Sequence, residues 1–379
     1  MRAHVVDPSA FTPAYDHALC ASLARAGAEV ELITSRFAYG SVPPPHGYAV
    51  REAFYTHVRG APGSRLRRAG KLIEHVPDML RYRRTARAAA ISHFQWLTMQ
   101  WLDADLLPDR PTVLTAHDLL PREPRPGQAW AQRRLYQAVD AIVVHSEYGR
   151  GQLVDALGVD SSKVHVIHHG AFEHLTRQPA EVRLPDQLSG VSGSVVLCFG
   201  LLRPYKGLGT LLEAWRGVEG AELWIVGRPR MPLPPLRALA PPGVRFVPRF
   251  VSDAELPAYF RRADIVVLPY SRTERFDQSG VLATALAFAK PTLLTEVGGF
   301  PEVAATGAAQ LVAPDDPDAL RQALSGLIAD AGARARLSAA ARVAAAGPYS
   351  WDDAAQRTLA VYRSVLRGTE VRLDARDRA

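Results

Sequence analysis

The sequence predicts an α/β protein made of two successive domains, each a parallel β-sheet covered by helices. Short apolar runs rich in β-branched residues alternate along the chain with segments that carry apolar residues at helical spacing. A length of 379 residues exceeds the usual span of one domain, and an apolar content of 47% is enough for two cores. Between the halves, residues 177–193 lack either periodicity and contain Pro179, Pro185 and Gly190, which predicts an interdomain linker there.

The first half, residues 1–176, alternates strand and helix patterns in the manner of a parallel sheet. A helix is predicted from Tyr15 to Ala26, closed by Gly27. Strands are predicted at Ala3–Val6, Glu29–Thr34, Ala90–Phe94, Thr112–Ala116, Ala141–His145 and Val164–Ile167. Polar residues end several of these runs, so we expect them to gather along one sheet edge: His93, His117-Asp118 and Ser146-Glu147.

The second half, residues 194–349, repeats this alternation. Helices are predicted at Asp253–Arg262 and Val281–Ala289, and over the alanine-rich run Asp318–Ala346. Strands are predicted at Val195–Phe199, Leu223–Val226, Val244–Val247, Ile265–Leu268, Thr292–Thr295 and Gln310–Val312. After the break at Gly347-Pro348, a final helix is predicted from Ser350, its N-cap, to Leu366, with residues 368–379 as a polar tail.

The stretch from Val195 to Arg228 organises the chemistry of the chain. It predicts a strand, a glycine-bounded turn that carries Arg203 and Lys206, a helix and a second strand that ends at Gly227. Open α/β sheets bind ligands at the carboxyl ends of their strands, where the N–H groups of a following helix favour an anion. With two cations in the turn, a diphosphate is the ligand that this site suits best. The alternative is a surface turn with two solvated cations.

Two further loops are predicted at the same sheet edge. Gln278-Ser279-Gly280-Val281 opens a helix, and the small Ser279-Gly280 pair allows a ligand to approach the helix N-terminus closely. Gly298-Gly299 follows another strand; alone, this pair would indicate an ordinary turn. Three such loops at one edge favour a ligand site.

Composition excludes several classes of protein and site. No run of about 18 apolar residues exists, so no membrane-spanning helix is predicted. The N-terminus lacks the apolar region of a signal peptide, and Cys20 and Cys198 lie among apolar neighbours, as expected for buried, reduced thiols in a cytoplasmic protein. No Cys/His cluster has metal-ligand spacing, and Asp103-Ala104-Asp105 is interpreted as a solvated loop, so no metal site is predicted.

The net charge of +7 is concentrated in the segment from Arg59 to Arg87. This segment contains nine Lys or Arg residues against Glu74 and Asp78. It could meet nucleic acid, an anionic membrane or an acidic substrate, or be a solvated basic face. The segment has a single aromatic residue, Tyr82. Proteins that bind single-stranded nucleic acid stack bases on several aromatic side chains, so nucleic acid is not expected as a partner. Apolar residues would strengthen a membrane contact if the segment is helical, although Pro77 predicts an interruption: Leu66, Leu72, Ile73, Val76 and Leu80.

The combined pattern resembles the family 4 glycosyltransferases. The resemblance rests on Phe199-Gly200 through Lys206-Gly207, Ile225-Val226-Gly227, Ala263-Asp264 through Tyr270, Gly280 through Glu302, Val166–Gly170, His117-Asp118 and Tyr349-Ser350-Trp351. It implies the GT-B fold, in which two Rossmann-like domains face each other across a cleft and a closing helix, here 350–367, crosses back to the N-terminal domain. It also implies retaining, metal-independent transfer from a nucleotide-diphosphate sugar to a hydroxyl acceptor, with no cofactor.

The resemblance assigns roles to individual residues. Lys206 matches the lysine that contacts the donor diphosphate, and His117 matches a histidine near the donor sugar. The backbone of Ser279, Gly280 and Val281 matches the amide cradle for the diphosphate, and Gly227 lies in a matching segment, so these four are expected to bind the donor.

The sequence departs from the family pattern at three positions. An arginine usual five residues before the lysine is Leu201 here, and Arg203 is the candidate replacement, expected to act with His117 and Lys206 in catalysis. Two family glutamates fall on Phe276 and Thr284. In the family, the first of these glutamates contacts the sugar hydroxyls and the second contacts the ribose. Three residues are candidates to replace them here, and the sequence does not select among these: Asp277, Gln278 and Thr284.

The sequence therefore predicts a retaining glycosyltransferase that uses a front-face mechanism. The alternatives are a GT-B epimerase or phosphorylase and a non-catalytic nucleotide-sugar-binding protein. A Rossmann dehydrogenase is disfavoured because no Gly-x-Gly-x-x-Gly follows the first strand. The expected location is cytoplasmic, with peripheral docking on the inner membrane face and a lipid-linked acceptor as candidates; the base, the sugar and the acceptor stay open.

Overall fold

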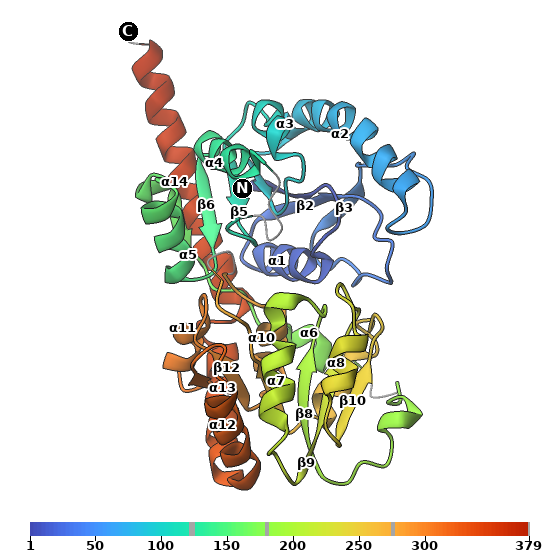
Figure 1. The fold of residues 1–379 in the computed structure, drawn as a ribbon. Coiled ribbons are helices and arrows are strands. Elements are labelled where there is room, and N and C mark those ends of the chain that lie inside the picture. The colour runs from blue at the N-terminus through green and yellow to red at the C-terminus, as the bar shows by residue number, and fades with distance from the viewer. Residues whose placement is uncertain (121–125, 179–181, 274–276, 378–379) are drawn as a thin grey trace. The chain divides into compact units, whose positions relative to one another are not determined.

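The computed structural model describes residues 1–120, 126–178, 182–273 and 277–377, and contacts divide them into two compact units (Figure 1). The first unit contains Met1–His168, Asp277 and the chain from Trp351 onward; the second contains the rest. The division at His168 lies ahead of the predicted linker at 177–193. Residues after it pack with the second unit, where Ala171 N donates to Tyr349 O at 2.7 Å.

The first unit is built on a seven-stranded sheet whose neighbours all pair in parallel, in the order β3-β2-β1-β4-β5-β6-β7. One strand, β3, was not predicted, because its sequence Ala-Val-Arg-Glu carries no apolar run and it lies exposed at the sheet edge. The strands are β1 (Arg2–Asp7), β2 (Glu29–Thr34), β3 (Ala49–Glu52), β4 (Ile91–Phe94), β5 (Thr112–Thr115), β6 (Ala141–Val144) and β7 (Val164–Val166).

Helices connect these strands, and two of them depart from the prediction. The helix α2 runs unbroken through Pro77, and α14 continues through most of the predicted polar tail. The helices are α1 (Pro13–Arg25), α2 (Arg65–Thr85), α3 (Gln100–Leu106), α4 (Gln128–Ala138), α5 (Glu147–Gly151) and α14 (Trp351–Asp377), with short helical turns η1 (Ala86–Ala88), η2 (Gln152–Ala156) and η3 (Ser161–Lys163).

The Asp103-Ala104-Asp105 sequence forms part of α3, so its interpretation as a solvated loop was wrong. Asp103 is fully buried, and its carboxylate lies 2.6 Å from His75 Nε2 and accepts a hydrogen bond from Met99 N at 2.8 Å. His75 Nδ1 in turn lies 2.7 Å from the Tyr55 hydroxyl. A buried carboxylate needs such partners, and these tie α2 to α3.

His93 was predicted at the sheet edge, but it lies inside β4 and joins the closing helix to the sheet. Its Nδ1 lies 2.7 Å from the Tyr362 hydroxyl on α14, and its Nε2 lies 2.7 Å from Thr115 Oγ1. Burial without a charge partner lowers the pKa of His93 to about 3, so the imidazole is neutral. The helix α14 also packs on α1, where the rings of Tyr15 and Trp351 lie 4.8 Å apart. The predicted return of the closing helix to the N-terminal domain is confirmed.

The second unit repeats the topology with a six-stranded parallel sheet in the order β10-β9-β8-β11-β12-β13. Both sheets therefore place their first strand in the middle and extend to either side, which is the Rossmann-like order. The strands are β8 (Ser194–Phe199), β9 (Ala221–Val226), β10 (Val244–Val247), β11 (Ile265–Leu268), β12 (Thr292–Thr295) and β13 (Ala309–Val312).

The alanine-rich run of the second unit forms two helices instead of one. Asp330 separates them, and its side chain caps the second helix by accepting a hydrogen bond from Ala333 N at 2.8 Å. The helices are α6 (Glu173–Thr176), α7 (Leu208–Trp215), α8 (Pro234–Leu239), α9 (Leu256–Arg262), α10 (Gly280–Ala287), α11 (Phe300–Ala305), α12 (Pro317–Ala329) and α13 (Ala331–Ala346), with turns η4 (Asp186–Leu188) and η5 (Pro204–Lys206).

Each unit has its own apolar core. In the second unit, Leu211, Leu212 and Trp215 of α7 are buried on one face of the helix and belong to the core of the sheet. Both cysteines are buried and free, and burial raises the pKa of the Cys198 thiol to about 12. Within the described residues, no helix is long and apolar enough to cross a bilayer.

The bond between Tyr362 and His93 gives a test of how the closing helix is held. Tyr362→Phe leaves the buried His93 Nδ1 without its partner and should lower the free energy of unfolding by about 1–2 kcal/mol in urea titrations. Ser364→Ala, on the exposed side of the same helix, is the control and should change little. Equal effects of the two substitutions would contradict this account.

Candidate functional site

In both sheets the strand order reverses beside the first strand, between β1 and β4 and between β8 and β11. Ligands of open α/β sheets bind outside the carboxyl ends of the strands at this switch point. In the second unit, the predicted diphosphate loop follows β8 and the predicted Ser279-Gly280 loop follows β11. The structure therefore places the two loops at adjoining strand ends.

Glycines allow the backbone segments at this edge to approach one another. Gly227 has φ of +147°, and a Cβ there would lie 1.8 Å from Gly200 O. Gly207 has φ of +65°, and a Cβ there would lie 1.7 Å from Pro269 O. Any side chain at either position would collide with backbone, so these glycines fix the loop geometry. Gly227, predicted to bind the donor, lies against the loop that carries Lys206 and has this structural role.

Lys206 is held inside this edge. It is 6% exposed, its ammonium donates to the Tyr270 hydroxyl, and Nζ lies 3.9 Å from the centroid of the Tyr270 ring. That hydroxyl lies 3.0 Å from Ser279 Oγ. Lys206 and Ser279, predicted to bind the same group, are thus joined through one tyrosine. A buried ammonium needs compensating groups, and an aromatic face with a hydroxyl supplies part of them.

Arg203 lies at the start of the short turn η5 that contains Lys206. Its Nε is buried and has no hydrogen-bond partner among the described residues. Leu201, which replaces the family arginine, is 39% exposed. A guanidinium with an unsatisfied, directional donor is well suited to an incoming oxyanion.

The first turn of α10 presents the predicted amide edge. Ser279 caps the helix by accepting from Val281 N at 3.3 Å, and Gly280 is exposed. The Gln278 side chain folds back, and its Oε1 accepts from Ser279 N at 3.0 Å. The eight-residue helix directs its free N–H groups to this edge, where they favour a negative charge.

The residues that are candidates to replace the missing glutamates differ in their hydrogen-bond partners. Thr284 is buried, and its hydroxyl donates to Gly280 O at 2.8 Å, so a ribose contact would require it to change partners. Asp277 belongs to the first unit, where its carboxylate accepts from His145 N at 2.7 Å and from the Ser146 hydroxyl. Asp277 is therefore a structural acceptor. Phe276 lies outside the described residues.

His117 lies in the loop after β5, the strand next to β4 in the first sheet. Its Nε2 is 3.1 Å from Gln95 Oε1 and its Nδ1 is 3.4 Å from His145 Nε2. Its ring stacks on Trp96, with the ring centroids 5.1 Å apart and the planes at 14°, and meets the edge of Tyr15 at 4.6 Å. The imidazole is thereby held in one orientation.

A pocket of about 300 Å³ opens beside His117, between the loops after β4 and β5 and the helix α4, and Phe11 from the loop after β1 also lines it. We call it the first-unit pocket. The sequence did not single out Gln95, Trp96 or Gln132, although Gln95 and Trp96 directly follow a predicted strand. The residues that line it include Phe11, Gln95, Trp96, Thr98, His117, Asp118, Gln128 and Gln132.

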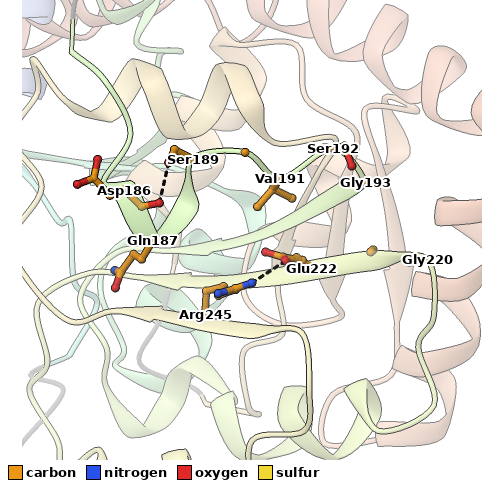
Figure 2. A pocket seen from close by; sticks show the side chains of 11 residues that line it. Asp186, Gln187, Ser189, Val191, Ser192, Gly193, Gly220, Glu222 and Arg245 are labelled. Carbon is orange, nitrogen blue, oxygen red and sulfur yellow. Dashed lines mark hydrogen bonds and ion pairs between the residues drawn. The ribbon is translucent and has the colours of Figure 1, made fainter.

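A larger, open hollow of about 570 Å³ in the second unit lies at the opposite sheet edge (Figure 2). Gly193 and Gly220, which line it, directly precede β8 and β9, so it borders the amino ends of the strands. Its Arg245 is paired with Glu222 at 3.0 Å. Size alone therefore does not mark the ligand site, because this hollow lacks convergent reactive groups.

The described part of the chain contains no candidate metal centre. No group of three or more His, Cys, Asp or Glu side chains there is arranged to hold a metal ion.

Comparisons with known families cover most of the chain. Residues 193–330 match the family described as Glycosyl transferases group 1, and residues 15–171 match Glycosyltransferase Family 4. The chain is 31% identical over 384 residues to a D-inositol 3-phosphate glycosyltransferase of Xylanimonas cellulosilytica, covering 92% of this chain and 90% of that protein. It is 26% identical over 339 residues to an alpha-maltose-1-phosphate synthase of Mycolicibacterium smegmatis, covering 80% and 86% of the two chains.

Solved structures confirm the GT-B fold. Sucrose-phosphate synthase from Thermosynechococcus elongatus matches with a TM-score of 0.74 at 18% identity, over 97% of this chain and 100% of that chain. Anabaena HepE, solved in complex with UDP-glucose, matches with a TM-score of 0.71 at 18% identity, over 98% and 100%. The motifs at the strand ends, the closing helix and these similarities agree: the chain belongs to the family 4 glycosyltransferases and is an enzyme of sugar transfer.

Proposed function

We propose that this enzyme transfers a sugar, with retention of anomeric configuration, from a nucleoside-diphosphate donor to a hydroxyl acceptor. The observation that carries the proposal is the buried Lys206 ammonium, held by the Tyr270 hydroxyl beside the capped N-terminus of α10. HepE binds UDP-glucose in its crystal structure, and that chemistry is extended here to this chain. A diphosphate carries the charge that such a site favours.

Departure of the diphosphate is the step that this site would assist. Negative charge builds on the leaving phosphate as the glycosidic bond breaks, and preorganised donors lower the barrier most when they are aimed at that charge. Lys206, Arg203 and the Gly280 amide are the proposed donors, and the Val281 amide would join them by releasing the Ser279 hydroxyl. The proposal therefore assigns the phosphate charge to the protein and includes no metal ion.

Retention is proposed through a front-face reaction in which the leaving phosphate accepts the proton of the attacking hydroxyl. His117, fixed by Gln95 and Trp96, is the proposed contact to the donor sugar. Orientation of the two reactants then supplies much of the rate enhancement.

Lys206→Ala tests the central assignment. Loss of one such donor should lower kcat by about 10²–10³-fold, measured as nucleoside diphosphate release with the preferred nucleotide sugar. Arg216→Ala, at the exposed end of α7, is the matched control and should keep full activity. Retention of near-normal turnover by folded Lys206→Ala would exclude Lys206 from the site.

Arg203→Ala tests whether this arginine replaces the one absent at Leu201. If its guanidinium contacts the diphosphate, binding of nucleoside diphosphate and nucleotide sugar should weaken about tenfold or more by calorimetry, because a charge-assisted hydrogen bond is lost. Binding of the bare nucleoside should not change. An equal loss for all three ligands would indicate a folding defect instead.

We further propose that α2 docks the enzyme on an anionic membrane surface, such as the inner membrane face, where a lipid-linked acceptor would be found. Leu66, Ile73 and Leu80 recur every seven residues on its outer side and are 67%, 75% and 42% exposed. Arginines, among them Arg65, Arg68 and Arg84, accompany this stripe. Exposed apolar residues flanked by cations suit the headgroup region of an anionic bilayer.

Co-sedimentation with vesicles tests the docking. Binding is expected to vesicles with anionic lipid, to fall as salt rises from 0.05 to about 0.5 M by screening, and to be absent with neutral vesicles. Replacing Leu66, Ile73 and Leu80 by serine should abolish it, whereas Val343→Ser, exposed on α13, should not. Sedimentation without vesicles would indicate self-association through α2, and a supernatant location with anionic vesicles would reject docking.

A further inference from the structure

We propose that Asp7 and Asp16 are positioning residues of the transfer reaction. The carboxyl pair that they form fixes the loop after β1, and this loop in turn holds the Trp96 ring on which His117 stacks. The inference rests on the proposed contact between His117 and the donor sugar. Three features of the first unit support it: the hydrogen bonds of Asp7, the proton that the pair shares, and the contacts that join the loop to His117.

Asp7 ends β1 and gathers the amides of the loop that follows. Its buried carboxylate accepts hydrogen bonds from three backbone N–H groups, those of Ser9 at 3.1 Å, Phe11 at 2.6 Å and Thr12 at 3.2 Å. Its carbonyl accepts from Ala10 N at 3.2 Å. In Rossmann-like domains, such a run of amides ahead of a helix favours an anion. Here the anion is the protein's own carboxylate.

The loop needs this anchor because its backbone is strained. Ala10 has φ of +50°, in the left-handed region that residues other than glycine rarely adopt. A conformation of this kind persists only where its surroundings hold it. The hydrogen bonds that Asp7 accepts on both sides of Ala10 supply that restraint. Without the carboxylate, we expect the loop to leave its present conformation.

Asp16 lies in the first turn of α1, and its buried carboxyl is hydrogen-bonded to that of Asp7. Two adjoining buried carboxyls do not both ionise, so the pair holds one proton. Bonds from backbone N–H groups favour the charged form of Asp7, so the proton belongs to Asp16, which donates to Asp7. Burial raises the pKa of Asp16 well above the usual range of a carboxyl, and the neighbouring Asp7 raises it further.

The loop holds Trp96, and through it His117. Thr12 Oγ1 accepts from Trp96 Nε1 at 2.9 Å and donates to Asp16 Oδ1 at 3.3 Å, so one hydroxyl joins the indole to the carboxyl pair. Phe11 meets the same indole edge-to-face, with the ring centroids 5.4 Å apart. Because His117 stacks on this indole, its orientation depends on the loop that the pair fixes.

The shared proton implies a pH dependence. As the pH rises through the raised pKa of Asp16, a second negative charge appears beside Asp7, and repulsion between the carboxylates should displace the loop. Other ionisable groups face the pair. Burial raises the pKa of the tyrosines and of the thiol among them and lowers that of the ammonium; these groups are Tyr15, His17 and Cys20 of α1, Tyr48, Glu52 of β3 and Lys71 of α2.

Steady-state kinetics of Asp7→Asn test the positioning role. Asparagine keeps the size of the side chain but removes the charge and one acceptor, so His117 should lose its fixed orientation. We expect kcat, measured as release of nucleoside diphosphate, to fall about tenfold to a hundredfold. Calorimetric binding of the nucleoside diphosphate alone should not change, because Lys206 lies in the second unit. Asp140→Asn is the control and should keep full activity, since Asp140 accepts from Thr112 N at the amino end of β5.

A double-mutant cycle shows whether Asp7 acts through the histidine. In a His117→Ala background, Asp7→Asn should lower kcat little further. Thr12→Val removes the hydroxyl that joins Trp96 to the pair, should cause a smaller loss, and decides the matter if Asp7→Asn does not fold. Equal losses in both backgrounds, unchanged kcat in the Asp7 and Thr12 variants, or weaker binding of nucleoside diphosphate would overturn the inference. Full turnover by His117→Ala would instead be a failure of the proposed donor contact.

The pH profile of kcat tests the shared proton. Turnover of the wild-type enzyme should fall at alkaline pH, and Asp16→Asn should lose this fall because its amide donates to Asp7 at every pH. Near neutral pH, Asp16→Asn should keep most of the turnover that Asp16→Ala loses. Lys71→Gln is the control and should keep the alkaline fall. A fall that is absent from the wild-type enzyme, retained by Asp16→Asn or lost in Lys71→Gln would overturn the assignment of the proton to Asp16.

Discussion

Close contact between backbone segments at the carboxyl ends of β8, β9 and β11 is the constraint on which the second unit depends. Gly227 lies against the carbonyl of Gly200, and Gly207 lies against the carbonyl of Pro269, at distances that leave no room for a side chain. Because these segments touch, Lys206 can reach Tyr270, and Tyr270 can reach Ser279. The packing of the main chain at these strand ends therefore brings the polar side chains of the site together.

The buried polar side chains of the two units have different kinds of partner. In the second unit the buried ammonium is stabilised by an aromatic hydroxyl and a ring face. In the first unit, His93, His75 and Asp103 are buried with complete local partners, whereas Gln95 and Gln132 are not. Satisfied groups of the former kind stabilise the fold, whereas a buried polar atom without a partner weakens it.

Much of the fold could be predicted from the sequence because parallel strands buried on both faces form continuous apolar runs. The predictions that were wrong concern residues whose environment is set by tertiary contacts. His93 looks like the polar end of a strand, yet Tyr362, far along the chain, makes it an interior residue. Pro77 lies on the exposed side of α2, where packing on the opposite side keeps the helix intact. Asp277 was one of three open candidates for the sugar contact, and no spacing indicates that it accepts hydrogen bonds from His145 and Ser146, just after β6. Propensity and spacing carry no information on such pairings.

The closing helix has a consequence for how the protein is made. The second unit is almost continuous in sequence, whereas the first needs α14, which packs on α1. Because the chain leaves the ribosome from its N-terminus at about 5–20 residues per second, the first unit is synthesised early and must wait for its last helix. The surface of the first unit that α14 covers therefore stays uncovered while the second unit is being synthesised.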